Sequence, residues 1–324
     1  MDAFMPDNAL TVARLLALLL VELAAGYGLQ VVDPGRFFRT RAWILLVAAT
    51  AITHQITLHS PAGFRMMALI AALFLGMKTV VAVNARVTGQ RALGIERWFI
   101  FATLWPGMRP SLFSKSRSRA LPGWKNLAWN GFFCLVLGIA FMVSAGWIWR
   151  ETRSTLAVTL LFFIGSSLLV HYGLFTLSAA FWRSRGFDCG LLFLNPFPSK
   201  TLGEFWGKRW NLAFHEMTAD AIYRPLEGIL PRQGMLLVSF ALSGLFHEVA
   251  ISLPVQAGFG LPLGYFLFQG ILVALERALL KRGWGFDRWT GHLWVIFWII
   301  LPLPILFHQP FLAGVVWPLI GVTP

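Results

Sequence analysis

A histidine–glutamate pair stands inside one of the apolar stretches of the sequence. His247 and Glu248 lie in the segment SGLFHEVAISLP, near the middle of a predicted membrane span, one turn after Ser243 and Gly244. A neutral histidine accepts a proton from a hydroxyl group near pH 7, which suits a general base. No second histidine follows at the spacing of zinc proteases, so no metal site is predicted. The alternative is a structural histidine that hydrogen-bonds to a neighbouring helix.

A second group of residues mixes cationic and aromatic side chains. The segment FWGKRWN, residues 205–211, places Lys208 and Arg209 between Trp206 and Trp210 and ends at Asn211. Arginine and lysine can meet phosphate groups, and a tryptophan face can stack on a base. An asparagine amide can donate to a developing oxyanion. The alternative is an interfacial belt of aromatic and basic residues.

Taken together and in this order, the two segments resemble a known family. FWGKRWN followed by SGLFHE is similar to the membrane-bound O-acyltransferase superfamily, and more closely to its wax-synthase-like branch, which carries F-W-G-R-R-W-N and then S-G-x-x-H-E. Lys208 replaces the usual arginine and keeps the charge. Asn195-Pro196-Phe197 and Thr201-Leu202 also resemble that branch. The specific similarity covers about residues 195–250.

The resemblance implies an enzyme that transfers an acyl group from acyl-CoA, or another thioester, to a hydroxyl group. His247 corresponds to the family's general base and Asn211 to its assisting asparagine. The other residues predicted to contact substrate are Trp206, Lys208, Arg209, Trp210, Ser243 and Glu248. Acyl-CoA would be a co-substrate and no resident cofactor is implied. The expected acceptor is a lipophilic alcohol, giving a wax-ester-like product; Glu248 either orients His247 or binds a neighbouring helix.

Two alternatives stay open. The acceptor can instead be the hydroxyl of a sterol, terpenoid, polyketide or sugar, with a short acyl donor. The chain can also be a multi-pass transporter with His247 and Glu22 on a polar pathway, because ionisable residues inside a membrane often mark such pathways. No inverted repeat supports this second alternative.

The composition shows which elements must position these residues. Of 324 residues, 57% are hydrophobic and 13% are charged. Soluble domains are about 45–50% apolar and about 25% charged, so a soluble or disordered chain is excluded. We expect an all-α polytopic membrane protein, one domain over 1–324, because the apolar stretches have the length of helices. Eight spans are predicted, at about 10–32, 42–59, 65–83, 127–149, 155–182, 235–257, 262–280 and 291–307.

The charges predict the orientation. There are 27 Lys and Arg against 14 Asp and Glu, a net charge of +13. Of the 27, 21 fall in loops on one predicted side and three on the other, which is the positive-inside pattern rather than a sign of nucleic-acid binding. Both termini are then expected on the non-cytoplasmic side, with a bacterial inner membrane favoured over the endoplasmic reticulum. Arg14, Lys78 and Arg277 lie within spans and are expected to extend to the interface. Oligomeric state stays open.

Two long cytoplasmic loops, about 84–126 and 183–234, are expected to hold structure of their own. The first contains a short aromatic piece at 98–105, predicted as re-entrant or interfacial. It also contains Lys115, Arg117 and Arg119, which can bind CoA phosphates or anchor a membrane surface. In the second, Thr201 and Glu204 have the spacing of a capping box, and the aromatic residues that follow recur at helical spacing. We therefore predict one amphipathic helix over 201–217.

Overall fold

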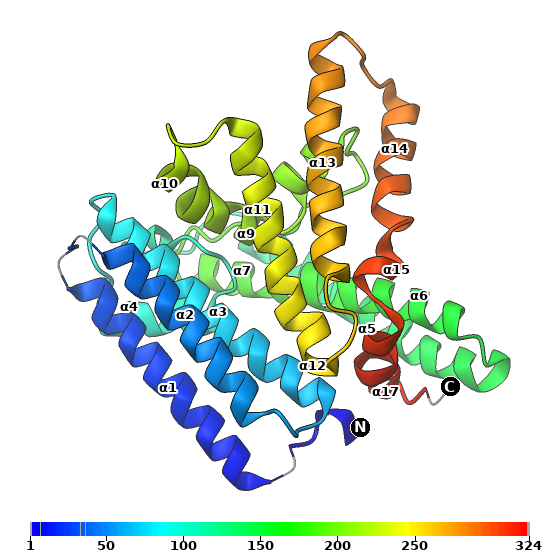
Figure 1. Ribbon diagram of the computed structural model, residues 1–324, viewed down its shortest axis with the longest axis horizontal. Helices are drawn as coiled ribbons and strands as arrows, with labels where there is room; N and C mark the ends of the chain where they lie inside the picture. The colour runs from blue at the N-terminus through cyan, green and yellow to red at the C-terminus, as the bar shows by residue number, and fades with distance from the viewer. Residues whose placement is uncertain (1, 7, 33, 36, 323–324) are drawn as a thin grey trace. The chain divides into compact units, whose positions relative to one another are not determined.

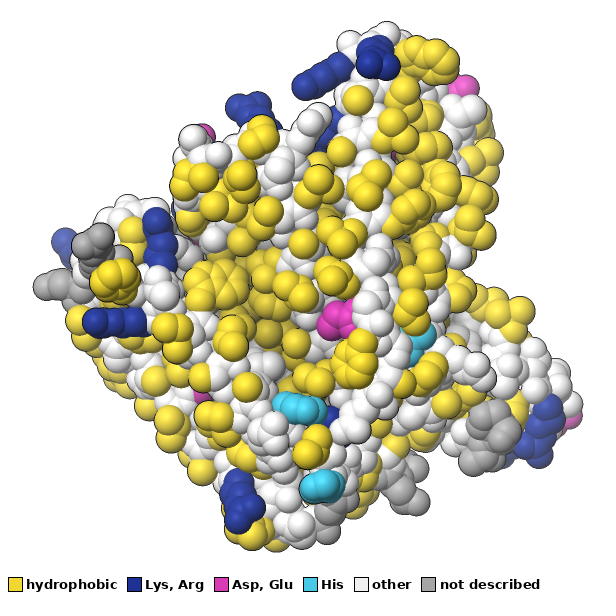
Figure 2. All heavy atoms as spheres, viewed as in Figure 1, with side chains coloured by type: hydrophobic (Ala, Val, Ile, Leu, Met, Phe, Trp, Pro, Cys, Tyr) yellow, Lys and Arg dark blue, Asp and Glu magenta, His cyan; other side chains and the backbone are white. Residues whose placement is uncertain are grey.

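The chain is built from helices. In the computed structural model, the described residues (2–6, 8–32, 34–35 and 37–322) form helices joined by turns and loops, and no strand occurs among them. The all-α prediction is thus confirmed. Figure 2 shows hydrophobic side chains along the helices, with Lys and Arg gathered near helix ends. An apolar exterior of this kind needs a hydrocarbon environment, and the chain is a multi-pass integral membrane protein.

Seven helical segments are long and apolar enough to span a membrane. They are Ala9–Val31, Ala62–Val87, Trp124–Thr152, Thr155–Ser184, Arg232–Val255, Leu261–Lys281 and Arg288–Leu306. Each coincides with one of the eight predicted stretches. The eighth stretch also forms a helix, α2 (Phe38–Ile56), but it is not apolar enough to be counted with the others. The sequence of α2 includes Arg39, Arg41, Thr53 and His54, which lower its mean hydropathy.

The described chain divides into two compact units, 1–192 with 313–324 and 193–312. The prediction of a single domain stays a prediction. The first unit contains α1 (Ala9–Val31), α2, α3 (Ala62–Val87), α4 (Ile95–Phe99), α5 (Trp124–Thr152), α6 (Thr155–Ser166), α7 (Phe175–Ser184) and α17 (Trp317–Leu319). The second contains α8 (Leu202–Glu204), α9 (Leu212–Thr218), α10 (Arg224–Leu226), α11 (Arg232–His247), α12 (Leu253–Val255), α13 (Leu261–Lys281), α14 (Arg288–Ile300), α15 (Leu303–Leu306) and α16 (Gln309–Phe311).

In the first unit, α1, α2 and α3 pack side by side (Figure 1). Of the three, α3 has the largest share of buried residues. The helix α5 packs on the following α6–α7 segment, where a Cβ atom at Gly138 would lie 2.6 Å from the backbone nitrogen of Leu169. Glycine is therefore required for this close approach of two helices.

The buried Lys78 contradicts one expectation. Its side chain is fully buried, and its Nζ donates to the backbone carbonyls of Trp105 (2.6 Å) and Gly107 (2.5 Å). The prediction that Lys78 extends to the interface is wrong, because these carbonyls at the end of the 95–104 helical segment satisfy the ammonium inside the protein. This segment consists of α4 and a π-helical turn, η2 (Ile100–Leu104), and is short, as predicted. Its re-entrant or interfacial location stays a prediction.

The orientation of the chain in the membrane also stays a prediction. One of the basic residues in the count, Arg36, lies outside the described residues. In the second unit, α11 packs on α13, and α13 pairs with α14 (Figure 1). The segment 194–218 and α11, with Glu248 directly after it, contain every residue of the two motifs.

Candidate functional site

The FWGKRWN segment does not form the single helix that was predicted. Thr201 caps α8 as expected, since its Oγ1 accepts from the backbone N–H of Glu204 at 3.0 Å. A π-helical turn, η5 (Phe205–Arg209), follows, and the helix then ends at Trp210, whose backbone is extended. Asn211 has a φ of 47°, in the left-handed region that non-glycine residues rarely adopt. The prediction of one helix over 201–217 is therefore wrong, because the chain turns at Trp210 and Asn211.

Asn211 begins the next helix. Its side-chain Oδ1 accepts from the backbone N–H of Phe214 at 3.1 Å and so caps α9. This contact fixes the oxygen end of the amide and leaves the Nδ2 donors with no hydrogen-bond partner among the described residues. The ring of Phe214 packs edge-on against Phe246 of α11, with ring centroids 6.2 Å apart. Phe246 precedes His247, so α9 contacts the helix that bears the candidate base.

Arg209 connects the FWGKRWN segment to the residues before it by hydrogen bonds. Its guanidinium donates to Glu204 Oε1 from Nε (2.9 Å) and Nη2 (2.6 Å), and from Nη1 to the carbonyl of Asn195 (3.1 Å). Burial opposes ionisation of Glu204. Hydrogen bonds from Arg209 and the Lys200 N–H, with the charges of Arg209 and Lys208, nevertheless hold the pKa of Glu204 below its ordinary value. Arg209 is thus engaged within the fold, whereas Lys208 is exposed to solvent.

The neutral ring of His247 is held in one tautomer. Its Nδ1 lies 2.7 Å from the backbone carbonyl oxygen of Ser243, one turn earlier in α11. A carbonyl only accepts hydrogen bonds, so Nδ1 bears the hydrogen and Nε2 of the neutral ring carries a lone pair. Nε2 has no hydrogen-bond partner within the described part of the chain. The ring packs on Phe266 of α13 with centroids 4.2 Å apart.

Glu248 contacts a neighbouring helix, which is one of the two roles predicted for it from the sequence. Its Oε1 accepts from the backbone N–H groups of Gly260 (2.9 Å) and Leu263 (3.0 Å), at the start of α13. These N–H groups have no partner within their own helix, so the carboxylate caps α13. Glu248 also begins a π-helical turn, η7 (Glu248–Ser252). The second oxygen, Oε2, is buried with no partner among the described residues, and a substrate contact by Glu248 stays a prediction.

The helices α11 and α13 approach closely beside His247. A Cβ atom at Gly244 would lie 2.8 Å from the Cα of Leu263, so a larger residue would push the two helices apart. Ser243 is buried at the same level, with its carbonyl on His247. The neighbour at this turn of α11 is thus the first turn of α13.

Trp206 connects the two motifs. Its ring packs on Phe240 of α11 (centroids 6.0 Å apart) and on Phe266 of α13 (5.7 Å). Because Phe266 also contacts His247, one aromatic ring separates Trp206 from the candidate base. Trp210 instead packs between Phe193 and Phe205, which fixes the turn before Asn211.

Two buried residues of α13 hold the segment in place, and the sequence analysis missed both. Gln269 accepts from Trp206 Nε1 (3.2 Å) and donates to the carbonyl of Trp298 (2.6 Å), which lacks its usual helical donor because residue 302 is proline. Glu276 accepts from the backbone N–H groups of Leu202 (2.7 Å) and Gly203 (2.9 Å). In the sequence, Pro302 is the local feature that indicates that a side chain must donate to the carbonyl of Trp298.

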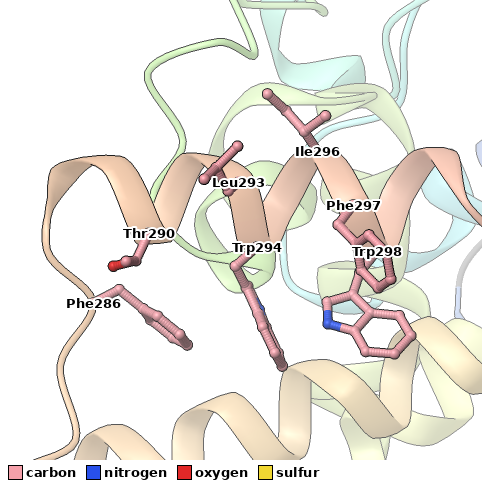
Figure 3. Close-up of a pocket in the computed structure, with 7 residues that line it drawn as sticks. All are labelled: Phe286, Thr290, Leu293, Trp294, Ile296, Phe297 and Trp298. Atoms are coloured by element: carbon pink, nitrogen blue, oxygen red, sulfur yellow. The ribbon is translucent and has the colours of Figure 1, made fainter.

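An open apolar groove of about 650 Å³ runs along α14. Figure 3 shows Phe286, Trp294 and Trp298 in a row on the side of α14 that faces α13, with Leu293 and Ile296 on the other side. Trp294 stacks on Phe286 (centroids 5.3 Å apart), and its Nε1 donates to Glu276 at 3.1 Å. Glu276 therefore hydrogen-bonds both to Trp294 in this groove and to α8, directly before the FWGKRWN segment.

Three further histidines have hydrogen-bond partners within the fold, whereas Glu22 has none among the described residues. His292 Nδ1 lies 2.9 Å from the carbonyl of Ser199, His171 lies 3.3 Å from Ser167 Oγ, and His54 lies 3.3 Å from Arg65. Glu22 is buried in α1, and both its carboxyl oxygens lack a hydrogen-bond partner among the described residues.

Comparison with known proteins shows what the motif-bearing part of the chain is similar to. The sequence profile of the membrane bound O-acyl transferase family matches residues 189–268, which include both motifs and the first eight residues of α13. Over these residues the chain is similar to the membrane-bound O-acyltransferase superfamily. Within it, the chain is similar to the wax-synthase-like branch. The long-chain-alcohol O-fatty-acyltransferase of Simmondsia chinensis is 31% identical over 105 residues, which is 30% of this chain and 30% of that protein.

Two other acyltransferases are similar to parts of the chain. A probable long-chain-alcohol O-fatty-acyltransferase 9 of Arabidopsis thaliana is 28% identical over 143 residues, 40% of this chain and 42% of that protein. Diacylglycerol O-acyltransferase 1 of the same plant is 31% identical over 116 residues, 35% of this chain and 20% of that protein. The matches thus cover less than half of the length of these curated relatives.

Proposed function

We propose that this protein is an acyl-CoA-dependent O-acyltransferase that transfers an acyl group from the thioester to the hydroxyl of a lipophilic alcohol. His247 acts as the general base and Asn211 assists. The names of the relatives support an acyl transfer to an alcohol or to diacylglycerol.

The observation that carries the proposal is the hydrogen bond from His247 Nδ1 to the Ser243 carbonyl. It leaves the lone pair of Nε2 to accept the proton of the alcohol. The alcohol oxygen attacks the thioester carbonyl carbon, the carbon–sulfur bond breaks, and the CoA thiolate leaves. The proton on Nε2 then passes to the thiolate, so His247 returns to its neutral form.

Asn211 suits the role of oxyanion donor. Its Oδ1 is used in capping α9, which orients the amide so that Nδ2 bears the only remaining donors. An amide fixed in advance loses no orientational freedom during the reaction, which is the requirement for oxyanion stabilisation. Lys208 is the exposed cation of the segment and is our candidate for a CoA phosphate. Arg209 we assign to positioning, because its donors engage Glu204 and Asn195.

The groove along α14 suits the hydrocarbon part of a substrate. Its walls are Phe, Trp, Leu and Ile side chains, with Thr290 as the single polar member. The groove is open and lies along a helix that is apolar enough to span a membrane, so a long hydrocarbon chain can reach it from the bilayer.

The test uses the purified protein in detergent with long-chain acyl-CoA and long-chain alcohols, following ester formation by mass and CoA release in parallel. We expect ester from the parent protein and loss of turnover, by roughly a hundredfold or more, in His247→Ala. His171→Ala is the matched control, since it removes a histidine from a helix of the first unit. Ester formation unchanged in His247→Ala would refute the assignment of the base.

Diacylglycerol is the second candidate acceptor, because a diacylglycerol O-acyltransferase is among the relatives. The same assay with diacylglycerol in place of the alcohol distinguishes the two products by mass. Dependence on His247 with triacylglycerol as the only ester would retain the mechanism and replace the acceptor.

A further inference from the structure

A second candidate site lies in the first unit, among residues that the proposed acyl transfer does not use. A groove of about 410 Å³ is lined by Glu96, Arg97, Ile100, Ser116, Phe181, Trp182, Arg185 and Phe187. These residues come from α4, the π-helical turn after it, the loop after Phe113, and the end of α7. The groove thus combines two arginines and one serine with aromatic and aliphatic walls.

The floor of this groove is a rigid aromatic cluster. Phe113 stacks on Phe187 (centroids 4.9 Å apart) and meets Trp182 edge-on (5.5 Å), and all three side chains are buried. The backbone above them is also fixed, because the N–H of Arg117 donates to the carbonyl of Gly186 at 3.0 Å. Gly186 has a φ of 85°, and a Cβ atom there would overlap Arg117. The shape of the groove is therefore built into the fold.

Both arginines of the groove are held by aromatic rings rather than by carboxylates. The guanidinium carbon of Arg97 lies 4.9 Å from the ring centre of Phe187, and that of Arg185 lies 5.4 Å from the ring centre of Phe181. Arg97 also donates weakly to the carbonyl of Phe113 (3.4 Å) and to Ser116 Oγ (3.3 Å). Neither arginine forms an ion pair within the described residues, in contrast to the nearby Arg183, which pairs with Asp188 at 2.6 Å.

Stacked, unpaired arginines favour a phosphate ligand. A guanidinium offers two parallel N–H donors that match two phosphate oxygens, and stacking on a ring orients it in advance. The groove has two arginines against one glutamate, Glu96, which is exposed, and so retains a positive charge. Lys115, Arg117 and Arg119, all exposed, add further positive charge beside it.

The surroundings of the groove favour a lipid over a soluble phosphate. Phe181, which lines it, is 50% exposed, and the adjacent Ile95 and Phe99 of α4 are 63% and 49% exposed. Apolar side chains so exposed, beside basic ones, are typical of the membrane interface, where hydrocarbon covers the first and head groups meet the second. A soluble nucleotide would leave the apolar residues uncovered.

We propose that this groove binds the phosphate of an anionic phospholipid, with its acyl chains against Ile95, Phe99 and Phe181. The proposal is independent of the acyl transfer at His247. Glu96 and Ser116 are then available to a hydroxylated head group such as glycerol. The net positive charge of the lining matches the single negative charge of phosphatidylglycerol.

The test measures lipid binding to delipidated protein in detergent by native mass spectrometry, with phosphatidylglycerol, phosphatidylcholine and phosphatidylethanolamine of matched chains. We expect one saturable phosphatidylglycerol per chain, bound about tenfold more tightly than phosphatidylcholine. The double variant Arg97→Gln/Arg185→Gln should weaken phosphatidylglycerol binding roughly thirtyfold. The matched control, Arg117→Gln/Arg119→Gln, removes the same charge from outside the groove and should weaken it less than about threefold.

The double variant can lose binding through misfolding, because Arg97 also contacts the loop beside it. A single variant that leaves Arg97 in place distinguishes this outcome from the loss of a phosphate contact. Arg185→Gln alters an exposed side chain and should weaken phosphatidylglycerol binding about fivefold with an unchanged melting temperature. Equal losses in the two double variants, or equal affinity for all three lipids, would overturn the proposal. A separate arm titrates CoA. Displacement of phosphatidylglycerol by CoA, with a weaker CoA affinity in Arg97→Gln/Arg185→Gln, would assign the phosphate to the nucleotide and also overturn it.

Discussion

Removal of the Glu276 carboxylate should release α8, the short helix directly before the FWGKRWN segment. In Glu276→Gln, one acceptor oxygen is replaced by an amide that faces backbone N–H groups of α8. The carboxylate is buried and accepts from Leu202 at 2.7 Å, Gly203 at 2.9 Å and Trp294 at 3.1 Å. Hydrogen bonds to a charged group contribute about 1.5–3 kcal/mol each, and the variant loses the equivalent of at least one. Local opening of this segment should therefore become roughly tenfold to hundredfold more frequent.

Hydrogen exchange of the peptide that contains Leu202 and Gly203 measures this directly. We expect faster exchange there in Glu276→Gln and little change in α11, because His247 is held by the Ser243 carbonyl and the Phe266 ring rather than by Glu276. Turnover should fall with the loss of order in the segment. Glu227→Gln removes an exposed carboxylate of the same unit and is the control. Unchanged exchange at Leu202 and Gly203 would refute the view that Glu276 positions this segment.

Three further predictions concern the same unit. Asn211→Asp keeps the oxygen that caps α9 but removes the amide donors, so melting should be unchanged while turnover falls by roughly a hundredfold. Gly244→Ala places a methyl group 2.8 Å from the backbone of α13 and should destabilise the protein by about 1–3 kcal/mol in thermal unfolding, whereas Gly264→Ala, with open space around it, should not. Glu204 has a lowered pKa in the fold, so its contribution to stability is present above its ordinary pKa and is lost as the pH falls through the lowered one; Glu204→Gln should abolish this acid-side loss in melting curves recorded against pH.

The membrane helices were predictable because span length is a local property of the sequence. A run of about 20 apolar residues forms a helix in hydrocarbon whatever its neighbours are. The α2 helix shows where this argument weakens, since its polar residues are compatible with a helix but reduce the apolar signal. The Thr201 cap was equally local and was confirmed.

The break at Trp210 and Asn211 was not predictable from periodicity. Aromatic residues recur at helical spacing on both sides of it, so the pattern continues although the backbone does not. Asparagine tolerates a positive φ better than most residues, but it does so at few of its occurrences. Lys78 and Glu276 were missed for another reason: their partners are backbone groups 27 to 74 positions away in the sequence.

The helix α13 explains how two separated motifs come to serve one site. Its first turn is capped by Glu248 and packs on Gly244, which fixes it to the helix of His247. Phe266, in its second turn, contacts both His247 and Trp206. Further along, Gln269 holds Trp206 and Glu276 holds the turn before it. These contacts come from residues spaced at helical intervals along one helix, and Gly270, one turn after Phe266, packs closely on Phe240 of α11. Because neither motif includes α13, the distance between His247 and Asn211 depends on residues that motif searches do not find, and substitutions on this face of α13 should impair the reaction without touching either motif.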